Sequence, residues 1–257
     1  MPEKLFILIL PLSSDFYERF IKRSFFLLTM NLVPESHLDL VCLYQEFYDK
    51  VQKSTSVLYP SCALDVSPSQ VFSNVTYVDI EDGISGAMQE FRKQGFKAVC
   101  QDIRNYKPTE HHDLLILLNP AIPAEWASQH IEEGAFIIAN NYHGTATEMF
   151  CDPVHYALFG TIDFTEKNRK EERYKAVVSQ NLDDLFIPCK DEKEVQERRP
   201  DIYKFISSVY PSLLQSFGQP TEGKSFGEIY EEVQKFKGSS IELPHRRVAE
   251  RYIFVKR

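Results

Sequence analysis

The stretch from Val57 to Asp82 carries the residues with the clearest chemical meaning. It predicts a buried strand, a turn of small residues that includes Ser61 and Ala63, and a second strand, Val75 to Ile80, that ends in acid. An acid at the end of a second strand, about twenty residues beyond a tight turn, is placed to accept hydrogen bonds from ribose hydroxyls. Asp79 is that acid, and the spacing predicts a nucleoside site.

Later predicted strands also end in polar residues. The third ends at Asp102-Ile103, the fourth at Asn119-Pro120, and the fifth at Asn140-Asn141, with His143 just beyond it. In an open parallel sheet, ligands bind outside the carboxyl ends of the strands where the strand order reverses. These residues are therefore expected along one edge of a sheet.

The elements that must position these residues alternate between strand and helix. Such a rhythm requires crossover connections and a mostly parallel sheet. The fold class predicted is α/β: a doubly wound, Rossmann-like sheet of about seven strands with an antiparallel closing strand, extra N-terminal helices and a helical insertion. The expected strands after the first are 75–80, 97–100, 113–118, 135–140, 156–164 and 252–255, following a strand-like run at 5–10. The expected helices are one after residues 13–15, then 34–51, 83–95, 123–131, 191–198, 200–217 and 225–236.

Domain organisation follows from these elements. The whole chain, 1–257, is predicted to be a single domain. Its parts are an N-terminal helical cap (1–54), a cofactor-binding core (55–164), an insertion (165–250) and a closing strand (251–257). The last two strands are expected to pair as an antiparallel hairpin with the insertion between them.

Composition limits the function classes. A content of 43% hydrophobic and 26% charged residues is typical of a globular protein with a large core. The net charge of −8 argues against a broad nucleic-acid surface, which needs a positive face. The five cysteines form no CxxC pair, and the histidines have no metal-ligand spacing, so we expect no metal site and a reducing, cytoplasmic setting. No run approaches the roughly 18 apolar residues needed to span a membrane.

The ordered strand ends resemble those of the class I S-adenosylmethionine-dependent methyltransferases, from Val57 to Asn141 and more weakly in the last two strands. The family's first motif reads approximately Val-Leu-Asp-x-Gly-x-Gly-x-Gly, and the matching residues here have no glycine: Val57-Leu58-Tyr59-Pro60-Ser61-Cys62-Ala63-Leu64-Asp65. Tyr59 replaces the usual acid, and Asp65 places a carboxylate where the family has none. The second motif, VTYVDIE, is well matched.

The resemblance implies S-adenosylmethionine as cofactor and an unknown small-molecule or macromolecular methyl acceptor as partner. The implied cofactor-binding residues are Tyr59, Ser61, Ala63, Asp79, Ile80, Asp102 and Ile103. Asp79 matches the ribose acid, and Asp102-Ile103 matches the adenine subsite. Asn119 and Pro120 match the transfer centre. For a base, the sequence itself offers His143 after the fifth strand, or His111 and His112 in a loop.

Two other readings stay open at this stage. The loss of the motif glycines, which supply positive φ and close backbone approach, favours a non-catalytic protein of this fold that binds another ligand or a partner protein. A nicotinamide-dependent Rossmann enzyme ranks last, because a pyrophosphate needs glycines at the turn even more strictly. The sequence does not indicate an oligomeric state.

Overall fold

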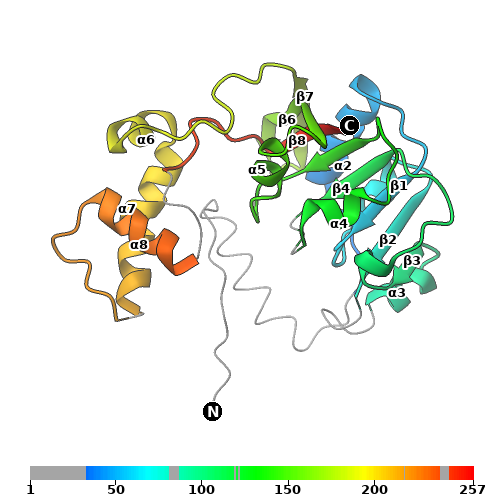
Figure 1. The fold of residues 1–257 in the computed structure, drawn as a ribbon, viewed down its shortest axis with the longest axis horizontal. Coiled ribbons are helices and arrows are strands. Elements are labelled where there is room, and N and C mark those ends of the chain that lie inside the picture. The colour runs from blue at the N-terminus through cyan, green and yellow to red at the C-terminus, as the bar shows by residue number, and fades with distance from the viewer. Residues whose placement is uncertain (1–32, 81–86, 119, 121, 217, 238–242) are drawn as a thin grey trace, which may run out of the picture. The chain divides into compact units, whose positions relative to one another are not determined.

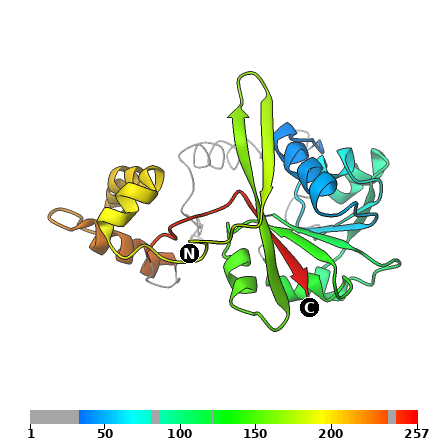
Figure 2. The same cartoon turned by 90° about the horizontal axis from the view of Figure 1, so that it is seen from above.

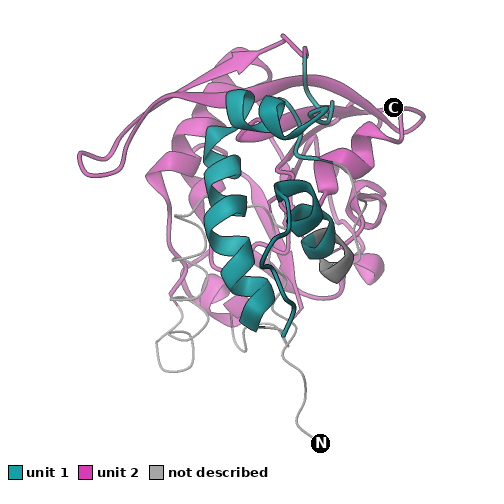
Figure 3. Cartoon of the chain, turned by 90° about the vertical axis from the view of Figure 1, so that its left-hand side faces the viewer, with its two compact units in different colours: residues 1–29, 184–248 teal, residues 30–183, 249–257 magenta. Residues whose placement is uncertain are grey.

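The computed structural model of the protein describes residues 33–80, 87–118, 120, 122–216, 218–237 and 243–257. Within these residues the chain forms two compact units. The sheet unit comprises residues up to 183 together with 249–257, and the helical unit comprises residues 184–248 (Figure 3).

The sheet unit is built on an eight-stranded sheet of described residues with the order β3-β2-β1-β4-β5-β8-β6-β7 (Figure 1). The first five strands run parallel to one another, and β8 lies antiparallel between β5 and β6. The strands are β1 (Val57–Pro60), β2 (Val75–Asp79), β3 (Lys97–Cys100), β4 (Leu114–Leu117), β5 (Phe136–Ala139), β6 (Tyr156–Asn168), β7 (Arg173–Ser179) and β8 (Arg251–Lys256). The predicted fold class is thereby confirmed.

Helices cover both faces of the sheet, which is why the central strands are apolar throughout. All four residues of β1 and of β4 are buried. Helices α2 (Leu38–Lys50) and α3 (Ala87–Lys93) pack with Val57 and Tyr59 in one large core on one face. Helices α4 (Ala124–Ser128) and α5 (Thr145–Phe150) lie across the other face (Figure 2).

Most predicted elements are present with bounds shifted by a few residues. The antiparallel pairing of the last two predicted strands is confirmed as β6 with β8. The predicted strand at 5–10, the predicted helix after residues 13–15 and the start of the predicted helix at 83–95 lie outside the described residues. The connection after β1 contains only a short 3-10 helix, η1 (Ser67–Gln70), before β2.

The end of the sheet differs from the prediction. Strand β6 continues to Asn168, and β7, which was not predicted, pairs with it antiparallel from Asn168↔Arg173 to Thr161↔Ser179. The two strands form a long hairpin that extends past the neighbouring strands (Figure 2). The stretch 165–250, predicted as an insertion, is therefore divided, since residues 165–183 belong to the sheet unit and residues 184–248 to the helical unit.

The helical unit has a core of its own. Helices α6 (Glu192–Arg198), α7 (Pro200–Ser216) and α8 (Phe226–Lys237) match the predicted ranges closely. Ile206, Tyr210 and Val233 are among its buried residues. Helix α8 begins with a capping box: the Ser225 amide donates to Glu228 at 2.8 Å, and the Glu228 amide donates to the Ser225 hydroxyl at 3.4 Å. Among the described residues, no helix has the length and apolar content of a membrane span.

Candidate functional site

The parallel strands bring the predicted site residues to one edge of the sheet. Their register pairs Pro60 with Val78, Asp79 with Cys100, and Leu117 with Ala139, so the strand ends are aligned. The strand order reverses at β1, which has β2 on one side and β4 on the other. This is the position at which open α/β sheets bind ligands.

The turn after β1 has an unusual backbone. Ser61 and Ala63 have φ values of 52° and 50°, in the left-handed region that glycine normally occupies. The Ser61 amide still donates to the Val78 carbonyl at 2.9 Å, so the turn remains anchored to β2. Left-handed conformations cost a non-glycine residue about 1–3 kcal/mol each and often occur at functional sites. Two residues of this turn, which contains no glycine, thus adopt a glycine-like conformation.

Asp79 lies directly beside this turn. One carboxylate oxygen, Oδ2, accepts from the Ala63 amide at 3.3 Å, and the other, Oδ1, accepts from the Ile80 amide at 2.8 Å. Partial burial raises the pKa of the Asp79 carboxyl, although the two amide hydrogen bonds act in the opposite direction. A carboxylate has about four acceptor positions, so two remain for a ligand. The neighbouring Ile80 side chain is 52% exposed and offers an apolar surface at the same edge.

Asp65 does not contribute a carboxylate to this site, contrary to the expectation from the sequence. Its side chain is buried and accepts hydrogen bonds from the Tyr59 hydroxyl at 3.1 Å and from the Ser67 amide at 2.8 Å. Burial is the main cause of the raised pKa of Asp65. Tyr59 is only 2% exposed, which leaves its backbone rather than its side chain for contact with a ligand. Through these hydrogen bonds Asp65 and Tyr59 stabilise the turn from the side that faces the core.

The Asp102 carboxylate is paired with Arg104, a residue that was not among the predicted site residues. Arg104 donates to Asp102 from its amide at 2.9 Å and from Nε at 3.0 Å and 3.1 Å. This pairing lowers the pKa of the Asp102 carboxyl to about 2. The Arg104 guanidinium also lies 4.7 Å from the centre of the Trp126 ring. The sequence does carry a signal for this ion pair, because an arginine lies two positions after the acid that ends the strand. Ile103 is buried.

Of the predicted catalytic residues, Pro120 and His143 lie after β4 and β5 respectively. Pro120 is buried, and Asn119 lies outside the described residues. His143 is solvent-exposed on the turn after β5, and its ring is 4.6 Å from that of Tyr142 in an edge-on arrangement. Partial desolvation lowers the pKa of His143 and raises the pKa of Tyr142 to about 12. A neutral imidazole at this edge is able to accept a proton.

Helix α5 holds this turn in place. The Thr147 amide donates to Asn141 Oδ1 at 2.9 Å, and Asn141 Nδ2 donates to the Thr147 hydroxyl at 2.9 Å. Gly144, at φ 83°, immediately precedes the helix. Asn141 therefore caps the start of α5. His143 lies between Asn141, which is hydrogen-bonded to the helix, and Gly144, which precedes it.

Comparisons with known proteins give structural likeness only. Neither a family model nor a curated protein matches the chain. The N-methyltransferase NodS from Bradyrhizobium japonicum, solved with S-adenosyl-L-homocysteine, is 11% identical with a TM-score of 0.38 over 52% of this chain and 80% of its own. An S-adenosylmethionine-dependent methyltransferase from Clostridium acetobutylicum is 17% identical with a TM-score of 0.32, and the match covers 63% of this chain and 79% of that protein. The sugar N-methyltransferase KedS8 from Streptoalloteichus is 13% identical with a TM-score of 0.34, and the match covers 65% of this chain and 66% of KedS8.

These identities and scores are too low to carry an argument, and the fold assignment rests on the sheet itself. Five parallel strands in the order β3-β2-β1-β4-β5, followed by the antiparallel β8 and then β6, form the doubly wound, mostly parallel, Rossmann-like sheet with an antiparallel closing strand that the sequence predicted. Strand β7 is an addition at its outer edge.

Proposed function

We propose that the protein binds S-adenosylmethionine at the turn after β1 and transfers its methyl group to an acceptor. The observation that carries this proposal is the pair of left-handed residues, Ser61 and Ala63, held against the strand-end carboxylate of Asp79 where the strand order reverses. Strained left-handed residues cluster at active sites and ligand-binding sites, which supports a functional role for this turn.

The residues present fit an adenosine-bearing ligand. Asp79 has acceptor positions left for two ribose hydroxyls, and Ile80 offers its exposed side chain to the base. The left-handed turn allows the backbone at Ser61 and Ala63 to approach the ligand closely. Asp102, paired with Arg104, borders the proposed base subsite.

Bound S-adenosylmethionine would supply an electrophilic methyl group on a sulfonium. The chain would contribute by holding the acceptor in line and by excluding water, the usual source of most of the rate in such transfers. Asn119 and Pro120 are the proposed transfer centre. His143 is the proposed base, since its lowered pKa keeps the imidazole neutral near pH 7.

We also infer a cytoplasmic location. The described residues contain no disulfide, and two of the cysteines, Cys62 and Cys189, are buried. This is the state expected in a reducing compartment. Unpaired thiols in protein isolated under non-reducing conditions would support the inference, and a disulfide in that material would oppose it.

Isothermal titration with S-adenosylhomocysteine tests the proposed cofactor site. The unmodified chain is expected to bind, and Asp79→Ala is expected to weaken binding by tenfold or more, because hydrogen bonds to a charged group contribute about 1.5–3 kcal/mol. Asp183→Asn, which changes an exposed carboxylate after β7, is the control and should bind normally. Thermal denaturation of each variant separates loss of binding from loss of folding.

Three outcomes would oppose parts of the proposal. Absence of binding at millimolar ligand would contradict the cofactor site and favour a protein of this fold with another ligand or a partner protein. Unchanged affinity in a folded Asp79→Ala variant would contradict the ribose assignment. Binding without transfer to any acceptor would leave a cofactor-binding protein without catalysis.

A further inference from the structure

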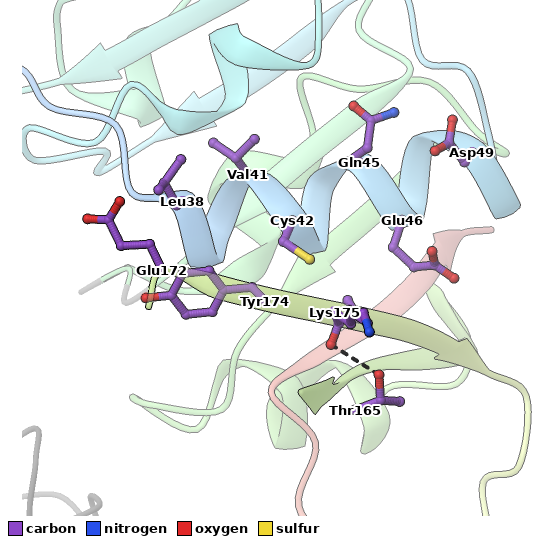
Figure 4. A pocket seen from close by; sticks show the side chains of 11 residues that line it. Leu38, Val41, Cys42, Gln45, Glu46, Asp49, Thr165, Glu172, Tyr174 and Lys175 are labelled. Carbon is purple, nitrogen blue, oxygen red and sulfur yellow. Dashed lines mark hydrogen bonds between the residues drawn. The ribbon is translucent and has the colours of Figure 1, made fainter. Parts of the chain in front are cut away.

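A groove lies between α2 and the β6–β7 hairpin, and the proposed cofactor site does not use it (Figure 4). Its volume is about 570 Å³, within the range of 300–1,000 Å³ usual for ligand sites. Along α2 the lining runs from Leu38 to Asp49. At 1.5 Å per residue this is about 16 Å, so the groove is long rather than round.

Part of the groove lining is apolar, and a hydrogen bond joins its two walls. Leu38 is 52% exposed, and Val41 and Tyr174 are half-buried beside it. Glu46 on α2 accepts a hydrogen bond from the Val178 amide of β7 at 3.3 Å, which ties the helix to the strand. An exposed leucine beside a half-buried tyrosine leaves apolar surface for a ligand to cover.

The charges at the two ends of the groove have the same sign. Figure 4 shows Glu172 beside Leu38 at one end and Asp49 with Glu46 toward the other. With the described residues, neither the Asp49 nor the Glu172 side chain forms a hydrogen bond or an ion pair. Lys175 is the basic side chain of the described lining, and it pairs with Glu166 at 2.9 Å. The groove thus presents a carboxylate toward each end of a lining that is partly apolar.

We propose that this groove binds a short basic peptide segment of another protein in an extended conformation. In an extended chain, residues i, i+2 and i+4 point to one face, and i to i+4 spans about 14 Å. Basic side chains at i and i+4 would meet the carboxylates of Glu172 and Asp49. An apolar residue at i+2 would lie near the middle of the groove, beside Val41 and Cys42.

Fluorescence anisotropy with two labelled peptides of identical composition tests this spacing. One has lysines at its first and fifth positions and leucine at its third, and the other has both lysines at one end. The full-length chain is expected to bind the first peptide at least fivefold more tightly. The preference should weaken in 0.5 M salt, which screens exposed charges.

The matched variants are Asp49→Asn with Glu172→Gln, and, as control, Asp183→Asn with Glu133→Gln. Both remove two exposed carboxylates from the sheet unit. The groove variant is expected to lose roughly fivefold to thirtyfold in affinity, from two exposed ion pairs, and the control less than twofold.

Four results would overturn the proposal. They are equal loss in both double variants, no loss in the groove variant, no preference between the two peptides, and equally tight binding of a free diamine. Circular dichroism confirms that each variant is folded. The measurement requires no cofactor, so its result is independent of the proposed methyl transfer.

Discussion

Ala63 carries a conformational strain that a single substitution can remove. Its φ of 50° costs a residue with a Cβ about 1–2 kcal/mol, and glycine avoids this cost but gains freedom in the unfolded chain. Ala63→Gly is therefore expected to raise the free energy of unfolding by up to about 1 kcal/mol, as measured by urea denaturation.

Ala127→Gly is the contrasting change, because Ala127 lies inside α4 and is fully buried. It should lower the free energy of unfolding by about 1 kcal/mol or more. If Ala63→Gly destabilised the protein as much as Ala127→Gly, the turn would not be strained in the way described.

The sequence predicted this site only in part. Asp79 was recognisable because an apolar strand precedes it and its distance from the small-residue turn is fixed by the fold. The left-handed backbone of Ser61 and Ala63 was not predictable, since neither residue type indicates positive φ. The inward orientation of Asp65 depends on the Tyr59 hydroxyl and on Ser67, and that contact appears only when the chain is folded.

At the scale of elements, a buried histidine links the opposite, amino-terminal ends of the strands. His112, just before β4, contacts the Ser56 hydroxyl at 3.0 Å through Nδ1 and the Tyr106 hydroxyl at 3.3 Å through Nε2. Its side chain is fully buried, and burial is the main cause of its lowered pKa, against the opposing influence of Glu110. The network ties the starts of β1 and β4 to the segment after η2 (Ile103–Asn105).

This network predicts a pH dependence of stability. Because the folded-state pKa of His112 lies below its usual value of about 6.5, the unfolded chain binds more protons in the interval between the two. The contribution of His112 to the free energy of unfolding is therefore complete above about pH 6.5, and it is lost as the pH falls toward the folded-state pKa. Urea denaturation between pH 7.5 and 5.5 should show falling stability, with a shallower slope in His112→Gln.

The exposed neighbour His111 provides the control. His111→Gln should leave the slope of stability against pH close to that of the unmodified chain. A slope unaffected by His112→Gln, in a variant that still folds, would mean that other groups cause the pH dependence.

The bounds of an element followed from sequence where clear turn residues flank it. Strand β3 has the predicted bounds because an apolar run follows Gly95, which ends the preceding turn at φ 86°. Strand β7 was missed because Arg173 and Lys175 are exposed on an edge strand with one pairing partner in the described sheet. Charged residues on an edge strand look like loop in sequence, although they protect such edges from aggregation.

At the scale of the whole molecule, the helical unit is inserted in the chain between β7 and β8, whose adjoining ends are close together in the sheet. Thr161 of β6 pairs with Ser179 on one side and with Tyr252 on the other. The strands that lead into and out of the helical unit are therefore about 10 Å apart, twice the usual strand spacing. An insertion with such close ends places little constraint on the sheet.

We predict that the sheet unit folds without residues 184–248. Replacing them with about eight glycine and serine residues spans the gap between β7 and β8. The shortened chain is expected to unfold cooperatively and to bind S-adenosylhomocysteine within threefold of the full chain. Loss of cooperative unfolding would show instead that the two units depend on each other and act as one domain.

The most direct test of the central claim observes the turn after β1 while the ligand binds. In a ¹⁵N-labelled chain titrated with S-adenosylhomocysteine, the amide resonances of residues 61–65 and of Ile80 are predicted to shift saturably. The same shifts should be absent in Asp79→Ala. Saturable shifts confined to other parts of the chain, or no shifts at millimolar ligand, would contradict a cofactor site built from Ser61, Ala63 and Asp79.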